Sequence, residues 1–152
     1  MEKLKTKEKH GMTKTQVYRA WADMKNRCYN KSLLNYFLYG GRGIRVCDEW
    51  FNSFTSFYND IGYLHKDGLI IDRIDNEKGY YPSNCRWVSP AISSCNQRNI
   101  GIFKKGVSLN RTKNKFISKI QVDGKSYYIG SFKDEISAHN SYLLVRKEWY
   151  GF

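Results

Sequence analysis

The sequence has no apolar stretch long enough to cross a bilayer and no basic amphipathic helix with a clean apolar face. Its first sixteen residues, MEKLKTKEKHGMTKTQ, also lack the apolar core of a secretory signal. We therefore expect a protein that has no membrane partner and resides in the cytoplasm. Residues 1–9 are expected to form a flexible basic terminus.

The four cysteines contain no C-x-x-C pair. Without a secretory signal, reduced thiols in a cytoplasm are expected. A structural zinc needs four converging ligands, and His10, Cys28, Cys47 and Cys85 would supply them only if the fold gathers distant segments. The alternative is that these cysteines are small buried apolar residues.

Acidic residues are scarce relative to basic ones. The chain has 26 Lys and Arg against 14 Asp and Glu, which gives a formal net charge of +12. Such a surplus indicates a polyanionic partner whose phosphates would dominate the affinity. The aromatic content of 16% adds rings that either stack on bases or fill a small core.

Residues 15–29 carry apolar side chains at intervals of four, three and four, which predicts a helix. Its basic side would either lie on DNA or be a solvated face. The glycine-rich YGGRG that follows lacks phosphate-loop spacing, so we predict a tight turn before a short strand at 44–47. Residues 48–61 again show helical spacing, and the large apolar side chains are expected to form the core: Trp21, Trp50, Phe51, Phe54, Phe57, Tyr58, Ile61 and Trp87.

Residues 69–99 read LIIDRIDNEKGYYPSNCRWVSPAISSCNQRN. A short apolar run ends at Asp72. A polar loop follows and leads through Asn84 into a second short run, CRWV. A proline-started polar segment then carries Ser93, Asn96 and Asn99. Strand, loop, strand and helix in this order would bring Asp72, Asn84 and the helix asparagines towards one point.

This segment resembles the ββα-metal core of HNH endonucleases, especially those of phages and mobile introns, and the resemblance extends over roughly residues 10–99. The matching tail residues are Asn84, Arg86, Trp87, Ser89 and Asn96. The chain departs from the family where Arg73 stands at the position of the catalytic histidine. Arginine stays protonated at physiological pH, so it cannot act as the base that activates water.

The resemblance implies a divalent ion, Mg²⁺ or Mn²⁺, with Asp72 as its carboxylate ligand and Ser93 or Asn96 completing the site. It implies Asp72, Arg73 and Asn84 as candidate catalytic residues. Arg73 would clamp the scissile phosphate, and Asn84 would hold the loop between the strands through backbone hydrogen bonds. The alternative is a ββα unit kept as a scaffold, with Asp72 and Asp75 capping turns.

A second unit follows a linker at 100–104. Strands are predicted at Val107–Asn110, 116–122 and 126–132, with Asp123-Gly124 as a hairpin turn. Asp134 is a good N-cap for a final helix that Gly151 ends. Apolar side chains then recur at four, three and four along this helix, which predicts its buried face: Ala138, Tyr142, Val145 and Trp149.

This unit resembles the Apetala-type DNA-binding domain in its G-V opening, its Y-I-G-x-F closing strand and its helix alanine. In that family a three-stranded sheet lies in the major groove and one helix covers its back. Strand alternation places Phe116, Ser118, Ile120, Tyr127 and Ile129 towards the helix. The resemblance then implies DNA contacts from the outward and adjoining positions: Lys105, Ser108, Asn110, Arg111, Lys119, Gln121, Ser126 and Tyr128. A sheet used for packing or protein contact is the alternative.

The predicted fold class is α+β: an HNH-like ββα-metal module at 10–99 and a three-stranded antiparallel sheet packed on one helix at 105–152. The predicted function is binding of double-stranded DNA by a monomer, as a homing-type endonuclease or nickase in the host cell of a phage or mobile element. The main alternative is a non-catalytic DNA-binding regulator or architectural protein on a degenerate HNH scaffold. A basic RNA- or ribosome-associated protein is a third hypothesis that depends on charge alone.

Overall fold

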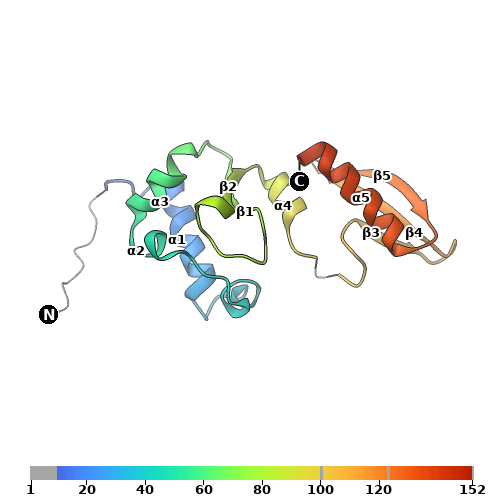
Figure 1. Cartoon of the computed structure of the whole chain (residues 1–152), viewed down its shortest axis with the longest axis horizontal. Helices are drawn as coiled ribbons and strands as arrows, with labels where there is room; N and C mark the ends of the chain where they lie inside the picture. The colour runs from blue at the N-terminus through green and yellow to red at the C-terminus, as the bar shows by residue number, and fades with distance from the viewer. Residues whose placement is uncertain (1–9, 100, 123, 152) are drawn as a thin grey trace. The chain divides into compact units, whose positions relative to one another are not determined.

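The computed structural model describes residues 10–99, 101–122 and 124–151, and the chain divides into two compact units, 1–89 and 90–152. Each unit combines helices with a small antiparallel sheet (Figure 1), which confirms the α+β class. Helix α4 (Pro90–Asn96) follows the first sheet in sequence but belongs to the second unit.

The first unit begins with the predicted helix, α1 (Gln16–Tyr29). Thr15 caps it, because its side-chain oxygen accepts the backbone N–H of Tyr18 at 3.2 Å. The remaining elements of the unit are η1 (Tyr36–Leu38), η2 (Gly40–Arg42), α2 (Asp48–Asn52), α3 (Phe54–Asp60), η3 (Gly62–Leu64), β1 (Ile70–Arg73), η4 (Pro82–Asn84) and β2 (Cys85–Val88).

Two local predictions for this unit are wrong. Residues 44–47 form no strand; Val46 makes an isolated parallel bridge with Tyr80 instead. The single helix expected over 48–61 is two helices, because Ser53 adopts an extended conformation and its side chain caps α3 through the N–H of Ser56.

Aromatic side chains are the largest members of the core of the first unit, as predicted. Trp50 and Phe57 are fully buried and meet edge to face, with ring centroids 5.1 Å apart. Trp21 is partly buried and donates its indole N–H to the carbonyl of Trp50 at 2.6 Å. Phe51 departs from the prediction, since it is 37% exposed and packs on Tyr29 at the surface.

Strands β1 and β2 form a two-stranded antiparallel sheet. Asp72 lies opposite Arg86, and Arg73 lies opposite Cys85. Asp72 is therefore inside β1 rather than just beyond its end. The alternation of the pair leaves Ile70 at the surface and buries Ile71 in the core.

The second unit contains a three-stranded antiparallel sheet with the strand order β3–β4–β5. Its strands are β3 (Val107–Asn110), β4 (Lys115–Val122) and β5 (Lys125–Phe132), and helix α5 (Glu135–Tyr150) lies along the sheet (Figure 1). The strand predictions are confirmed to within one residue. Gly124 has the positive φ that a tight hairpin needs, whereas Asp123 lies outside the described residues.

Helix α5 has the caps that were predicted. Asp134 accepts the N–H of Ser137 at 2.8 Å, and Gly151 ends the helix at a φ of 77°. Its buried face contains Ala138 and Tyr142, and Tyr142 forms the core of this unit with Ile120 and Val122 of β4. Trp149 was expected in this core but is 51% exposed; its ring lies against that of Tyr127.

Close packing also determines which residue can stand just before β3. Gly106 has a φ of +80°, and a Cβ at this position would overlap with the ring of Tyr142. A glycine is thus needed where the chain passes over the buried tyrosine. Among the described residues, no helix combines the length and the apolar character that a bilayer span requires.

Candidate nucleic-acid interface and candidate metal site

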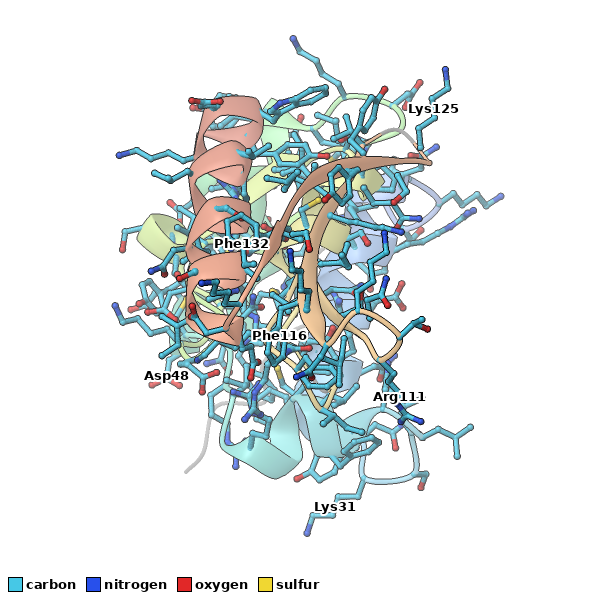
Figure 2. All side chains as sticks on the ribbon, turned by 90° about the vertical axis from the view of Figure 1, so that its right-hand side faces the viewer. Lys31, Asp48, Arg111, Phe116, Lys125 and Phe132 are labelled. Atoms are coloured by element: carbon cyan, nitrogen blue, oxygen red, sulfur yellow. The ribbon has the colours of Figure 1, made fainter. Side chains whose placement is uncertain are left out.

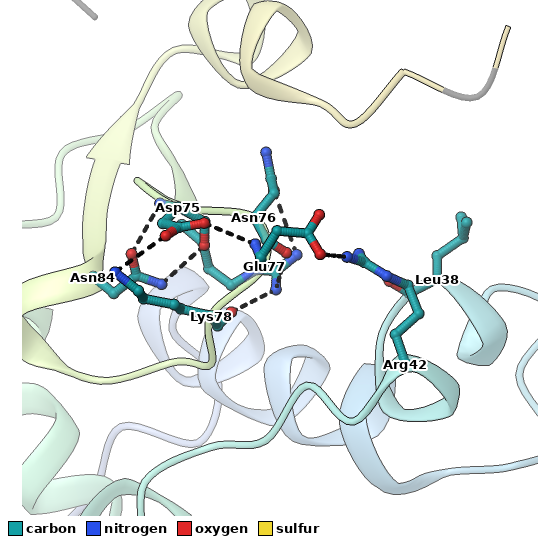
Figure 3. A network of polar contacts seen from close by, with 8 residues as sticks. Leu38, Arg42, Asp75, Asn76, Glu77, Lys78 and Asn84 are labelled. Atoms are coloured by element: carbon teal, nitrogen blue, oxygen red, sulfur yellow. Dashed lines mark hydrogen bonds and ion pairs between the residues drawn. The ribbon is translucent and has the colours of Figure 1, made fainter.

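Asn84 organises the loop between β1 and β2 (Figure 3). Its side-chain oxygen accepts the N–H of Asp75 at 2.9 Å, and its amide donates to the carbonyls of Asp75 at 3.1 Å and Gly79 at 2.8 Å. The side chain is only 3% exposed, so these bonds satisfy groups that water does not reach. This arrangement is the loop-holding role that the sequence suggested for Asn84.

Arg73 holds the same loop from inside. Its Nη1 donates to the carbonyls of Lys78 at 2.8 Å and Asn76 at 3.1 Å. The guanidinium lies 5.3 Å from the ring centroid of Tyr39 and 5.1 Å from that of Tyr80. Arg73 is 6% exposed. In this structure its guanidinium therefore supports protein groups, in contrast to the phosphate clamp that the HNH resemblance implied.

The outer part of the loop is held by charged groups. The N–H of Glu77 and the ammonium of Lys78 lower the pKa of the Asp75 carboxyl below its ordinary value. Glu77 also accepts from Arg42 at 2.6 Å, which connects the loop to η2 (Figure 3). Loop 74–79 is thus held by hydrogen bonds on both its buried and its exposed sides.

Asp72, the candidate carboxylate ligand, is 7% exposed and pairs with Arg86, whose Nε and Nη2 both lie 3.3 Å from its Oδ2. The other candidate ligands, Ser93 and Asn96, are in the second unit, where the side-chain oxygen of Asn96 accepts from Arg146 at 3.1 Å. A hard divalent ion requires several converging oxygen ligands. Within the described residues, no three His, Cys, Asp or Glu side chains gather closely enough to hold a metal ion. The Mg²⁺ or Mn²⁺ of an HNH site stays a prediction for this chain.

The four candidate zinc ligands, all of them described, do not gather as a group of three or more. His10 packs its ring on Phe54, with centroids 4.4 Å apart, and accepts the N–H of Met12. Burial raises the pKa of the Cys28 thiol to about 11 and that of Cys85 to about 12, and it also raises the pKa of Cys47. All four cysteines are free.

The side of the β3–β4–β5 sheet that faces away from α5 carries most of the predicted DNA-contacting residues. Lys119 lies opposite Tyr128, and Gln121 lies opposite Ser126. Opposite residues of an antiparallel pair share a face, and these four are exposed while their neighbour Ile120 is 2% exposed. Register places two β3 residues on this side as well. We call the set the outward face: Ser108, Asn110, Lys119, Gln121, Ser126 and Tyr128.

The outward face is polar and basic. Its described residues include no carboxylate, and Lys115 lies on the same side, opposite Asn110. The exposed Arg111 follows β3, and Lys125 begins β5 at the hairpin end of the sheet (Figure 2). Asn110 accepts the N–H of Lys113 at 3.1 Å, which shapes the β3–β4 turn. Side-chain cations thus border the sheet at both ends.

Lys105 does not fit the predicted contact with DNA. Its ammonium donates to the carbonyls of Ser94 at 2.9 Å and Gln97 at 2.7 Å, and it thereby caps the end of α4. Burial lowers its pKa. Lys105 also lines a pocket of about 320 Å³, together with Ser94, Ser108, Lys119, Gln121 and Tyr142.

The sequence did not predict two features of the first unit. Arg86 was read as a motif residue, and its pairing with Asp72 was not predicted, although the opposite charges at facing strand positions were a usable signal. The second feature is a cluster in which Arg27 and Arg73 each lie within 6 Å of the rings of Tyr39 and Tyr80. No periodicity connects these four positions.

Comparison with protein-family models, with curated proteins and with solved structures gave no match to this chain.

Proposed function

We propose that this chain binds double-stranded DNA through the outward face of the β3–β4–β5 sheet. The observation that carries the proposal is the alternation of β4 and β5, which puts lysine, amide, hydroxyl and phenol groups on one side and the α5 contacts on the other. Lysine, glutamine and serine are the side chains that bind phosphates and base edges in grooves. A two- or three-stranded sheet is among the elements that enter a major groove.

Charge supports the same partner. Residues 90–152 contain eleven Lys and Arg against four Asp and Glu. Asp134 and Glu135 lie at the start of α5 and Glu148 near its end, so the described carboxylates of this unit are on or beside the helix. Among the described residues of this unit, a duplex approaching the outward face would therefore meet cations and no facing carboxylate. The resemblance to the Apetala-type domain, which uses the same face, supports this orientation.

We propose further that the β1–β2 unit acts as a scaffold rather than as a nuclease. Asp72 pairs with Arg86, Arg73 donates to loop carbonyls, and Asn84 holds the loop, so each candidate catalytic side chain has a structural partner. This supports a non-catalytic DNA-binding protein, such as a regulator or an architectural protein, over an endonuclease.

Fluorescence anisotropy with a labelled duplex tests the binding proposal. The logarithm of the association constant should fall linearly with the logarithm of the salt concentration, because neutralised phosphates release counterions. Lys119→Ala/Gln121→Ala should weaken binding at least about tenfold. Lys147→Ala, a change of the same charge on α5, should have a much smaller effect. Equal losses in the two variants, or an absence of duplex binding at low salt, would refute the proposal.

A plasmid assay tests the scaffold role. Supercoiled plasmid incubated with the protein and Mg²⁺ or Mn²⁺ should not accumulate nicked circles above the level seen with Asp72→Ala. Nicking by the parent protein that disappears in Asp72→Ala would establish the endonuclease instead. Both proteins should bind the plasmid equally, which an electrophoretic shift without divalent ions checks.

A further inference from the structure

The first unit carries an apolar projection between α1 and η2. Residues 31–38 read KSLLNYFL, and we call them the apolar knob. Leu34 is 96% exposed and Phe37 is 66% exposed, the two highest values among the large apolar side chains described in this unit. Exposed apolar side chains that gather in one segment mark a contact surface, in contrast to apolar residues that are scattered singly.

The knob has a defined backbone. The N–H of Leu33 donates to Asn30, that of Tyr36 to Leu33, and that of Tyr39 to Tyr36, at 2.9–3.2 Å. At its carboxyl end, Gly40 packs so closely on α1 that a Cβ there would overlap with the carbonyl of Cys28. Leu34 and Phe37 are therefore presented from a chain of turns that is anchored at both ends.

The sequence on both sides of the knob is rich in basic residues. Between Asp23 and Asp48 the sequence contains no Asp or Glu and five basic residues: Lys25, Arg27, Lys31, Arg42 and Arg45. Lys31 is exposed and points away from the ribbon (Figure 2), and Arg45 is exposed and donates to the carbonyl of Gly40 at 2.9 Å. Arg42 pairs with Glu77 of the neighbouring loop.

An apolar tip flanked by cations matches a partner with an apolar interior and an anionic rim. Stacked bases between two phosphate chains have that chemistry, and leucine and phenylalanine are among the side chains that wedge between base steps. We propose that Leu34 and Phe37 insert between bases and locally unstack the duplex. This inference rests on the proposed DNA binding and assigns the first unit a role in deforming the DNA.

The test compares a mixed-sequence duplex with the same duplex carrying one bulged base. Because the bulge has already lost part of its stacking, the wild-type protein should bind it at least about fivefold more tightly. Leu34→Ala/Phe37→Ala should bind both duplexes alike. The matched control Ile102→Ala/Leu144→Ala removes side chains that are 96% and 67% exposed, and it should keep the preference. Thermal melting checks that all three proteins are folded.

The outcomes separate the two proposals. Duplex binding without any bulge preference, or a preference that survives in Leu34→Ala/Phe37→Ala, would overturn the wedge and leave the outward face intact. No duplex binding at all would overturn both. Sedimentation of the protein alone and with phosphatidylglycerol vesicles completes the test. If the double variant lost self-association or vesicle binding while keeping the bulge preference, the knob would be a dimer or membrane contact instead.

Discussion

Asp72 and Arg86 face each other across the β1–β2 sheet, and two guanidinium nitrogens of Arg86 lie 3.3 Å from one carboxylate oxygen of Asp72. The side chain of Asp72 is 7% exposed and that of Arg86 is 26% exposed. The candidate metal ligand of the motif thus has a cationic partner within the protein.

Removing Arg86 should destabilise the protein because it leaves a buried carboxylate without its cation. We expect Arg86→Ala to lower the free energy of unfolding by about 3 kcal/mol. Asp72→Ala/Arg86→Ala should cost less than the sum of the two single changes, since the double variant removes both charges. Urea unfolding of the four proteins gives the coupling energy. Strict additivity would mean that the pair contributes nothing.

Asn84→Ala should cost about 3 kcal/mol, because it leaves buried loop groups of Asp75 and Gly79 without their hydrogen-bond partner. Asn59→Ala is the matched control, as Asn59 is exposed on α3 and should change stability by less than about 0.5 kcal/mol. Thermal melting monitored by circular dichroism compares them. Similar melting temperatures for the two variants would contradict the role assigned to Asn84.

In the second unit, Tyr142 should be the aromatic residue of α5 that contributes most to stability. It is 3% exposed and packs with Ile120 and Val122, so Tyr142→Ala should cost about 3–4 kcal/mol. Trp149→Ala should cost only about 1 kcal/mol, since half of that side chain is already in water. Denaturant unfolding followed by hydrogen exchange in residues 105–151 distinguishes them. A larger loss for Trp149→Ala would show that the helix face is assigned wrongly.

The buried thiols predict a loss of stability at alkaline pH. Burial raises the pKa of Cys28 from 9.0 to about 11 and that of Cys85 from 9.0 to about 12. Above pH 9 the unfolded state releases these protons while the folded state retains them, so stability falls as pH rises towards 11. Urea unfolding between pH 8 and 10.5 should show this decline, and Cys85→Ala should make it shallower. An identical pH slope in the variant would exclude the thiol as its cause.

Helices and strands were predicted correctly from the sequence wherever one local signal was strong. Helix α5 was predicted with both of its ends, because Asp134 and Gly151 act on the neighbouring backbone alone. The sorting of Lys119 and Gln121 to the outward face likewise follows from the alternation of a single strand. The expected strand at 44–47 failed because a β-strand needs a partner, and Val46 meets only one residue, Tyr80, across a bridge.

What sequence alone determined was therefore the class of the fold, the cationic character of the chain, and the sheet-and-helix order of its second half, since each depends on composition or on short-range periodicity. Tertiary structure alone decided the partners of the candidate site residues. Arg73 turned inward to Tyr39 and Tyr80, Lys105 capped α4, and Asn96 met Arg146, fifty positions away. These contacts join segments that are distant in the sequence, and a long polar side chain takes whichever acceptors the packed chain brings within reach.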